Sequence, residues 1–178
     1  MSYSADSIAN GLLERAEAEG VELTNLQLQK LVFFCHAWNF GFGGEVPLVD
    51  EPVEAWRHGP VFRSLYDEFK HFGKGPVRSR AQDFSFDTAS GKLQIVYPTI
   101  AKESVSSAYK DEYVDELLSW VWSRYAGLNP FDLVRITHAD GEPWRIVKDQ
   151  YPELPRGLHI PNPLIRECYR KKAAELNN

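Results

Sequence analysis

Residues 24–44 predict a helix that lies buried at the centre of the fold. Thr24 and Gln27 have the spacing of a capping box, in which a hydroxyl and an amide each satisfy a free backbone group at a helix start. The run Gly41–Gly44 ends the helix, because glycine tolerates the dihedral angles that a helix stop needs. Apolar side chains after the cap recur at helical spacing and make one broad face: Leu28, Leu31, Val32, Phe33, Phe34, Cys35 and Trp38. A face of this width favours a helix that other elements surround.

Further helices are predicted on both sides of this segment. Ser4 or Asp6 can cap the first of them and Gly20 can end it, while Pro60 and Pro130 fit first helical turns. The expected ranges are Asp6–Glu19, Val61–Phe72, about 101 or 102 to 125, Pro130 to about His138, a short piece after Trp144, and Asn162 to about Glu175.

Two stretches between these helices have the character of strands. Residues 52–56 read as a short extended piece, and Lys92–Tyr97 reads as a strand that pairs with 83–86 across a turn. The sequence therefore predicts a mainly α (α+β) protein. We expect a single compact domain of about six helices with a small β-hairpin or short sheet, spanning residues 1–178 with its core at about 5–170.

The charge balance excludes some classes of partner. The chain has a net charge of −5, whereas a general nucleic-acid binder gains affinity from Lys and Arg that displace counterions. Direct nucleic-acid binding is therefore not expected. The chain has no run of 18 apolar residues and no positive-then-apolar start, so we expect neither a membrane span nor a signal peptide, and a cytoplasmic location.

Motifs for catalysis, cofactors and metals are missing from the sequence. It contains no GxSxG elbow, no Walker loop and no GxGxxG, and its five histidines form no HExxH pair. Neither Cys35 nor Cys168 has a CxxC neighbour, and Cys35 is expected to be a buried thiol. We predict no catalytic residue, no cofactor and no metal. Carboxylates that meet across the fold leave one alternative open, an enzyme acting on a nucleotide or small metabolite.

Two segments place aromatic, cationic and turn residues close together outside long helices. They are residues 54–62 and 137–144. Both fit a structural interpretation, in which Trp fills a crevice, His caps a helix and Pro and Gly set the turn. Both also fit a recognition surface, because Trp, Tyr and Arg dominate the binding energy of protein interfaces. The candidate partner-binding residues are Trp56, Arg57, His58, Tyr66, His138 and Trp144.

These segments resemble the Panacea-domain family, the domain of SocA-like antitoxins and of proteins labelled phage-associated. The resemblance covers about residues 5–170. The residues that carry it are the run 24–34, the run Glu54–Val61 with Leu65 and Tyr66 after it, and Thr137–His138 with Pro143–Trp144.

The resemblance implies an antitoxin that neutralises a cognate toxin protein encoded beside it. It implies two alternative routes: direct complex formation, or an adaptor role that delivers the toxin to an ATP-dependent protease. Some relatives carry a DNA-binding helix-turn-helix region, and none is evident in these residues. An acidic antitoxin suits a basic toxin, because opposite charges favour association.

Overall fold

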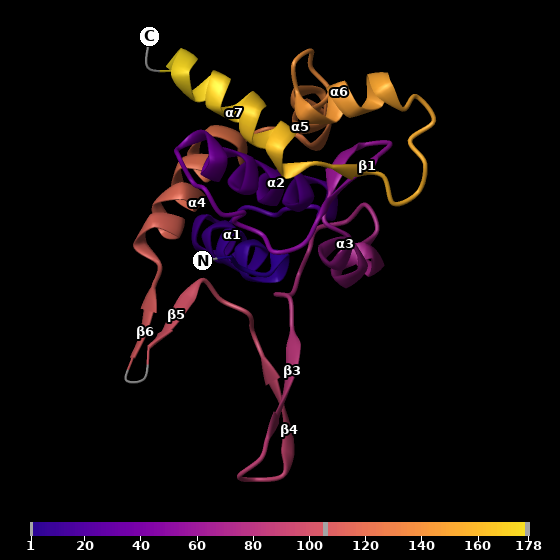
Figure 1. The fold of residues 1–178 in the computed structure, drawn as a ribbon. Coiled ribbons are helices and arrows are strands. Elements are labelled where there is room, and N and C mark those ends of the chain that lie inside the picture. Colours follow the sequence, from indigo (N-terminus) through magenta and orange to yellow (C-terminus); the bar gives the residue numbers. More distant parts are fainter. Residues whose placement is uncertain (1, 105–106, 177–178) are drawn as a thin grey trace.

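Helix α2 (Asn25–Gly41) lies at the centre of the computed structural model, which describes residues 2–104 and 107–176 (Figure 1). The other long helices, α1 (Ala5–Glu19), α4 (Glu112–Tyr125) and α7 (Asn162–Leu176), pack around it. Nearly every α2 side chain is buried, polar ones included. The predicted central helix is therefore confirmed, and the elements around it cover more than one face.

The start of α2 is held by the predicted capping box. The Thr24 hydroxyl accepts a hydrogen bond from the Gln27 N–H at 3.3 Å, and the Gln27 Oε1 accepts one from the Thr24 N–H at 3.0 Å. Each bond satisfies a donor that a helix terminus otherwise leaves free. The local sequence therefore sets where the central helix begins.

His36 is a polar side chain placed wholly inside this core. Its Nδ1 accepts the Val49 N–H at 3.2 Å, so the ring is the Nε2-protonated tautomer, which donates to Asn162 Oδ1 at 2.9 Å. Burial lowers the pKa of His36 to about 4, because the interior disfavours the charged ring. Cys35 beside it is fully buried, as predicted, and burial raises the pKa of its thiol.

The predicted helix over residues 61–72 is wrong at its start. Residues 59–61 form strand β2 (Gly59–Val61), followed by α3 (Arg63–Phe69) and a 3-10 turn, η1 (Lys70–Phe72). The side chain of Gln29 accepts the Phe62 N–H at 3.1 Å and donates to its carbonyl at 3.4 Å. This pairing with α2 holds the backbone extended, so Pro60 lies in a strand and not in a helical turn.

The predicted helix over about 101–125 is also too long. Strands β5 (Ala101–Ser104) and β6 (Ser107–Lys110) pair first, and α4 begins only at Glu112. The Asp111 carboxylate accepts the Val114 N–H at 3.5 Å and so caps the helix. Residues 105 and 106 of the predicted helix lie outside the described residues.

The remaining helices begin within one or two residues of their predicted starts. Asn129 caps α5 (Pro130–Thr137) by accepting the Asp132 N–H at 2.9 Å, and α6 (Pro143–Gln150) begins at the proline before Trp144. Helix α7 starts at Asn162, whose side chain bonds to His36. Helix α1 is capped by Ser4 and ends at Gly20 in the left-handed conformation.

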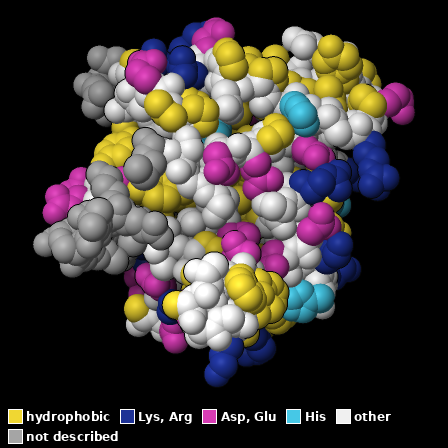
Figure 2. All heavy atoms as spheres, turned by 60° about the horizontal axis from the view of Figure 1, so that its bottom comes forward, with side chains coloured by type: hydrophobic (Ala, Val, Ile, Leu, Met, Phe, Trp, Pro, Cys, Tyr) yellow, Lys and Arg dark blue, Asp and Glu magenta, His cyan; other side chains and the backbone are white. Residues whose placement is uncertain are grey.

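The β-structure of the described residues divides into a packed sheet and projecting hairpins. Strand β1 (Val53–Trp56) pairs antiparallel with β2 on one side and with β7 (His159–Ile160) on the other. Strands β3 (Asp83–Asp87) and β4 (Lys92–Val96) form the predicted hairpin, which extends away from the helices (Figure 1). Figure 2 brings this lower face forward and shows hydrophobic and acidic side chains gathered on it.

The buried apolar side chains form one connected cluster that draws on α1, α2, α4 and α7 and on the packed sheet. The mainly helical fold class with a small sheet is confirmed. The described residues contain seven α-helices, one more than about six, because the short piece after Trp144 is a helix in its own right. None of the helices in the described part of the chain combines the length and hydropathy needed to cross a membrane.

Candidate functional site

The six candidate residues meet around the β1–β2 hairpin and the helices beside it. Trp56 ends β1, Arg57 and His58 form the exposed turn, and Tyr66 lies on α3. His138 and Trp144 approach from the end of α5 and the start of α6. Residues 80 positions apart in the sequence therefore share one region.

Trp56 is fixed by a carboxylate and a guanidinium. Its indole N–H donates to Glu54 Oε2 at 2.7 Å, and the same carboxylate pairs with Arg63 through Nε at 2.8 Å and Nη2 at 2.9 Å. The Arg63 hydrogen bonds hold the pKa of Glu54 below its usual range. The Arg63 Cζ lies 5.1 Å from the centre of the Trp56 ring, within the range of a cation–π contact.

Tyr66 completes the aromatic part of the surface. Its ring centre lies 4.7 Å from that of Trp56, at an interplanar angle of 60°. Both side chains are half-buried, so each has one side against the protein and one toward solvent. Such a pair offers apolar area at low entropic cost, because its rotamers are already fixed.

Trp144 supports the hairpin from beneath. Its indole N–H donates to the Trp56 carbonyl at 2.8 Å, and only 5% of the residue is exposed. His138 stacks on it with ring centres 3.6 Å apart and nearly parallel planes. Burial, reinforced by the nearby Lys30 and His58, lowers the pKa of His138 to about 4. Trp144 therefore positions the site, while Arg57 and His58 face solvent.

Lys30 anchors the hairpin to α2 from inside the core. The side chain is fully buried, and its ammonium donates to the Pro60 carbonyl at 2.9 Å. Among the described residues no carboxylate pairs with it, and burial lowers its pKa to about 7. Gly59 lies directly over it with φ +103°, where an added Cβ would come 2.9 Å from Lys30 Nζ and 2.8 Å from Thr137 Oγ1. The turn therefore requires glycine.

A shallow pocket of about 360 Å³ opens beside Trp56. Three of its side chains are arginines, and no Asp or Glu lines it. The loop after α6 forms the opposite wall, where the Leu158 carbonyl accepts the Ala55 N–H at 2.7 Å. The lining residues are Ala55, Trp56, Arg57, Arg63, Leu154, Pro155, Arg156 and Gly157.

The charge of this pocket is opposite in sign to that of the whole chain. The net charge is −5, whereas Arg57 and Arg156 bring positive charge to the pocket, and Arg63 is already paired with Glu54. The pocket suits an acidic or aromatic side chain of a partner, which an arginine can meet by a charge-assisted hydrogen bond or by stacking. The net negative charge of the chain therefore does not predict the positive charge of this pocket.

Several contacts of the site were not predicted from the sequence. The Glu54–Arg63 pair, Lys30, and Leu154–Gly157 come from separate stretches that the fold brings together. Glu54 was part of the segment noted for its composition, but its partner lies nine residues later in α3. Among the described residues, no group of three or more His, Cys, Asp or Glu side chains could hold a metal ion.

Comparison with known proteins gives two matches to the sequence and none to a solved structure. The family model "Antitoxin SocA-like, Panacea domain" matches residues 28–145, a range that contains all six candidate residues. A protein named Antitoxin SocA, from Caulobacter vibrioides (strain NA1000 / CB15N), is 31% identical over 170 residues. The match covers 95% of this chain and 84% of that protein.

Proposed function

The chain belongs to the family of SocA-like antitoxins with a Panacea domain, and from this premise we propose that it neutralises a partner toxin by binding it directly. The relative that this chain matches over 95% of its length is named as an antitoxin. We propose a non-enzymatic mechanism in the cytoplasm, in which the complex covers the working surface of the toxin. The partner is a protein, and the mechanism needs neither a cofactor nor direct contact with nucleic acid.

The observation that supports a binding role is the aromatic and cationic surface around Trp56. Arg57 and His58 are exposed on a turn, and Trp56 and Tyr66 are half-buried beside a pocket of about 360 Å³. Protein interfaces draw most of their binding energy from a few such Trp, Tyr and Arg side chains near a pocket. The remainder of a standard interface, about 800 Å² on each partner, then excludes water around these anchors.

The rigidity of this surface favours tight binding. Lys30 and Gln29 fix the β1–β2 backbone to α2, and Glu54 with Arg63 fixes the Trp56 ring. A surface that is already ordered loses little conformational entropy when a partner docks. Arg57 extends from this ordered base into solvent, where it can contribute to the rate and the specificity of association.

Growth rescue tests the proposal. The chain is co-expressed with the product of the neighbouring gene, and wild type is expected to restore growth. Arg57→Glu, which reverses charge on the exposed turn, is expected to abolish or weaken the rescue. Arg124→Glu on α4 is the matched control, because Arg124 is also an exposed arginine and lies on an element outside the β1–β2 hairpin. Equal rescue by both variants would remove the β1–β2 surface from the account.

A protease-deficient host separates masking from the adaptor route. Direct masking predicts that rescue persists when the ATP-dependent proteases are missing, because occupancy of the toxin is sufficient. An adaptor predicts that rescue is lost in that host although the two proteins still bind. The second result would replace masking with delivery and leave the antitoxin role in place.

A further inference from the structure

The β3–β4 hairpin has one apolar face and one polar face. Its register places Phe84 opposite Ile95 and Phe86 opposite Leu93, and side chains two residues apart on a strand share a face. The four large apolar side chains therefore lie on one side of the ribbon. The polar pairs of the same register, such as Ser85 with Gln94, lie on the other side.

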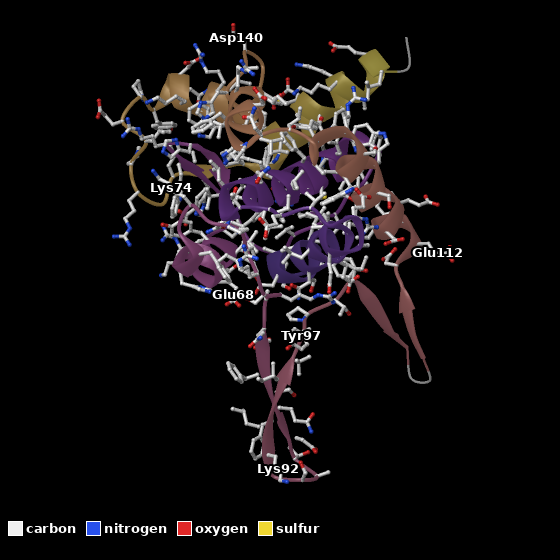
Figure 3. All side chains as sticks on the ribbon, turned by 180° about the vertical axis from the view of Figure 1, so that it is seen from behind. Glu68, Lys74, Lys92, Tyr97, Glu112 and Asp140 are labelled. Carbon is white, nitrogen blue, oxygen red and sulfur yellow. The ribbon has the colours of Figure 1, made fainter. Side chains whose placement is uncertain are left out.

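This apolar face is open to solvent. Phe84 and Phe86 are 63% and 61% exposed, and Leu93 and Ile95 are 65% and 55% exposed. In Figure 3 the ribbon runs from Tyr97 near the body to Lys92 at its tip, with no helix beside it. A soluble protein rarely leaves a contiguous apolar patch of this kind uncovered unless something binds there.

A buried amide on α1 bonds to the chain on both sides of the hairpin. Asn10 on α1 is 2% exposed, and its side chain accepts the Ala81 N–H at 2.8 Å. The same amide donates to the carbonyl of Ala81 at 3.0 Å and to that of Pro98 at 2.9 Å. These three bonds hold both ends of the ribbon at one point on α1.

The turn at the tip is ordered by its own side chains. The Asp87 carboxylate accepts the Ala89 N–H at 2.9 Å and the Ser90 hydroxyl, and the Asp87 carbonyl accepts the Gly91 N–H at 2.8 Å. Gly91 has φ +66°, the left-handed conformation that glycine adopts without strain. Hydrogen bonds therefore fix both the base and the tip of the ribbon, although its apolar face is uncovered.

Acidic side chains collect where the hairpin leaves the body. Burial, reinforced by the negative charges of Glu68, Glu51 and Asp83, raises the pKa of Asp6 to about 6. One Asp6 carboxylate oxygen is buried with no hydrogen-bond partner among the described residues. Glu68 lies at the base of the ribbon in Figure 3, and Figure 2 shows acidic side chains across this face. No described lysine or arginine pairs with these four carboxylates.

We infer that the β3–β4 ribbon and its acidic base form a docking surface for a basic amphipathic segment of the toxin. Apolar side chains of that segment cover Phe84, Phe86, Leu93 and Ile95, and its Lys or Arg side chains pair with the carboxylates at the base. This inference rests on the proposed function and adds a second contact surface to it, opposite in charge to the pocket beside Trp56.

Charge selects this occupant over two others. An anionic membrane surface attracts basic segments, and the acidic base of the ribbon would be repelled from it. A second copy of the chain carries the same net charge of −5, which opposes its approach. A basic protein segment satisfies the apolar face and the carboxylates at the same time.

Titration of the full chain with the purified product of the neighbouring gene tests the inference. The double variant Phe84→Ser with Phe86→Ser is expected to weaken binding by at least about tenfold, because both rings lie on the proposed contact face. The matched control is Ser85→Ala with Gln94→Ala on the polar face, which is expected to bind as wild type does. Glu51→Gln with Glu68→Gln is expected to reduce both the affinity and its salt dependence. Thermal melts of all variants confirm folding.

Each outcome decides a different point. Unchanged affinity of the Phe84 and Phe86 variant overturns the inference. A wild-type chain that sediments alone as a dimer, and as a monomer after those substitutions, overturns it in favour of a second copy. Wild-type binding that is sensitive to Arg57→Glu but not to the ribbon variants leaves the proposed function intact. If wild type neither binds nor rescues growth, the proposed function itself fails.

Discussion

The β1–β2 and β3–β4 hairpins have opposite relations to the core. The β1–β2 hairpin is covered by α2 and α6, receives a buried lysine, and is extended by a third strand, β7. The β3–β4 hairpin has both edges free of a third strand in the described residues, and its apolar face is uncovered. Both are antiparallel two-stranded hairpins, but only the β1–β2 hairpin packs against the core.

The difference shows what each hairpin depends on. The β1–β2 turn is shaped by contacts below it, so a change there alters stability and recognition together. The ribbon residues contact one another and solvent, so a change there alters recognition with little effect on the folded state.

The two hairpins should differ most in how a glycine substitution in the turn changes the free energy of unfolding. Gly59→Ala forces a side chain to a φ of +103° and against Lys30 and Thr137, at an expected cost of about 4 kcal/mol in the free energy of unfolding. Gly91→Ala meets no neighbouring atom and carries only the left-handed backbone penalty of about 1 kcal/mol. Urea denaturation measures both, and equal costs would refute the contrast.

Replacement of the buried lysine should change the pH dependence of stability. The pKa of Lys30 is about 7 in the folded protein and about 10.4 when unfolded, so the unfolded chain binds more protons between these values. The free energy of unfolding therefore falls as the pH drops from about 10.4 to about 7, because protonation of the buried amine disfavours the folded state. Below pH 7 the amine is protonated in both states and this loss is complete.

Lys30→Met removes this titration. Between pH 9 and pH 7, wild type is expected to lose about 2 kcal/mol relative to the variant, measured by denaturation at each pH. Lys74→Met is the control, because Lys74 is exposed. Parallel pH profiles for wild type and Lys30→Met would show that the buried amine keeps its ordinary pKa.

Removal of the Asn10 side-chain amide should loosen the attachment of the β3–β4 hairpin to α1. Asn10→Ala leaves the N–H and carbonyl of Ala81 and the carbonyl of Pro98 without their partner, at an expected cost of about 2 kcal/mol. Hydrogen exchange should quicken across 83–96 more than across 53–61. Uniform quickening throughout the chain would mean that Asn10 supports the whole core instead.

Polar substitution on the ribbon face should have the smallest effect on stability. Phe84→Ser with Phe86→Ser is expected to change the free energy of unfolding by less than about 0.5 kcal/mol, because both rings are already exposed. A calorimetric melt measures this. A loss of several kcal/mol would show that the rings pack against the body.

Local signals in the sequence predicted much of the fold. The Thr24 and Gln27 capping box and the glycine after α1 mark helix ends, because a cap acts through residues three or four positions away. The β3–β4 hairpin was also predicted, since its alternation and its turn are local. What could not be predicted is its exposure, which depends on elements elsewhere in the chain.

The errors share a long-range cause. Pro60 suits a first helical turn by local criteria, but Gln29 and Lys30 hold its neighbourhood extended from α2. All six predicted site residues lie in one region, although the buried position of Trp144 and the Glu54–Arg63 pair had no local mark. Pairings between residues far apart in the sequence decide these features, and periodicity does not encode them.

Calorimetric titration of the purified chain with the purified product of the neighbouring gene, with no protease present, tests direct neutralisation. The account predicts one saturable complex with a Kd below about 1 µM, weakened at least about tenfold by Arg57→Glu. Growth rescue in cells without any detectable complex between the two purified proteins would contradict it.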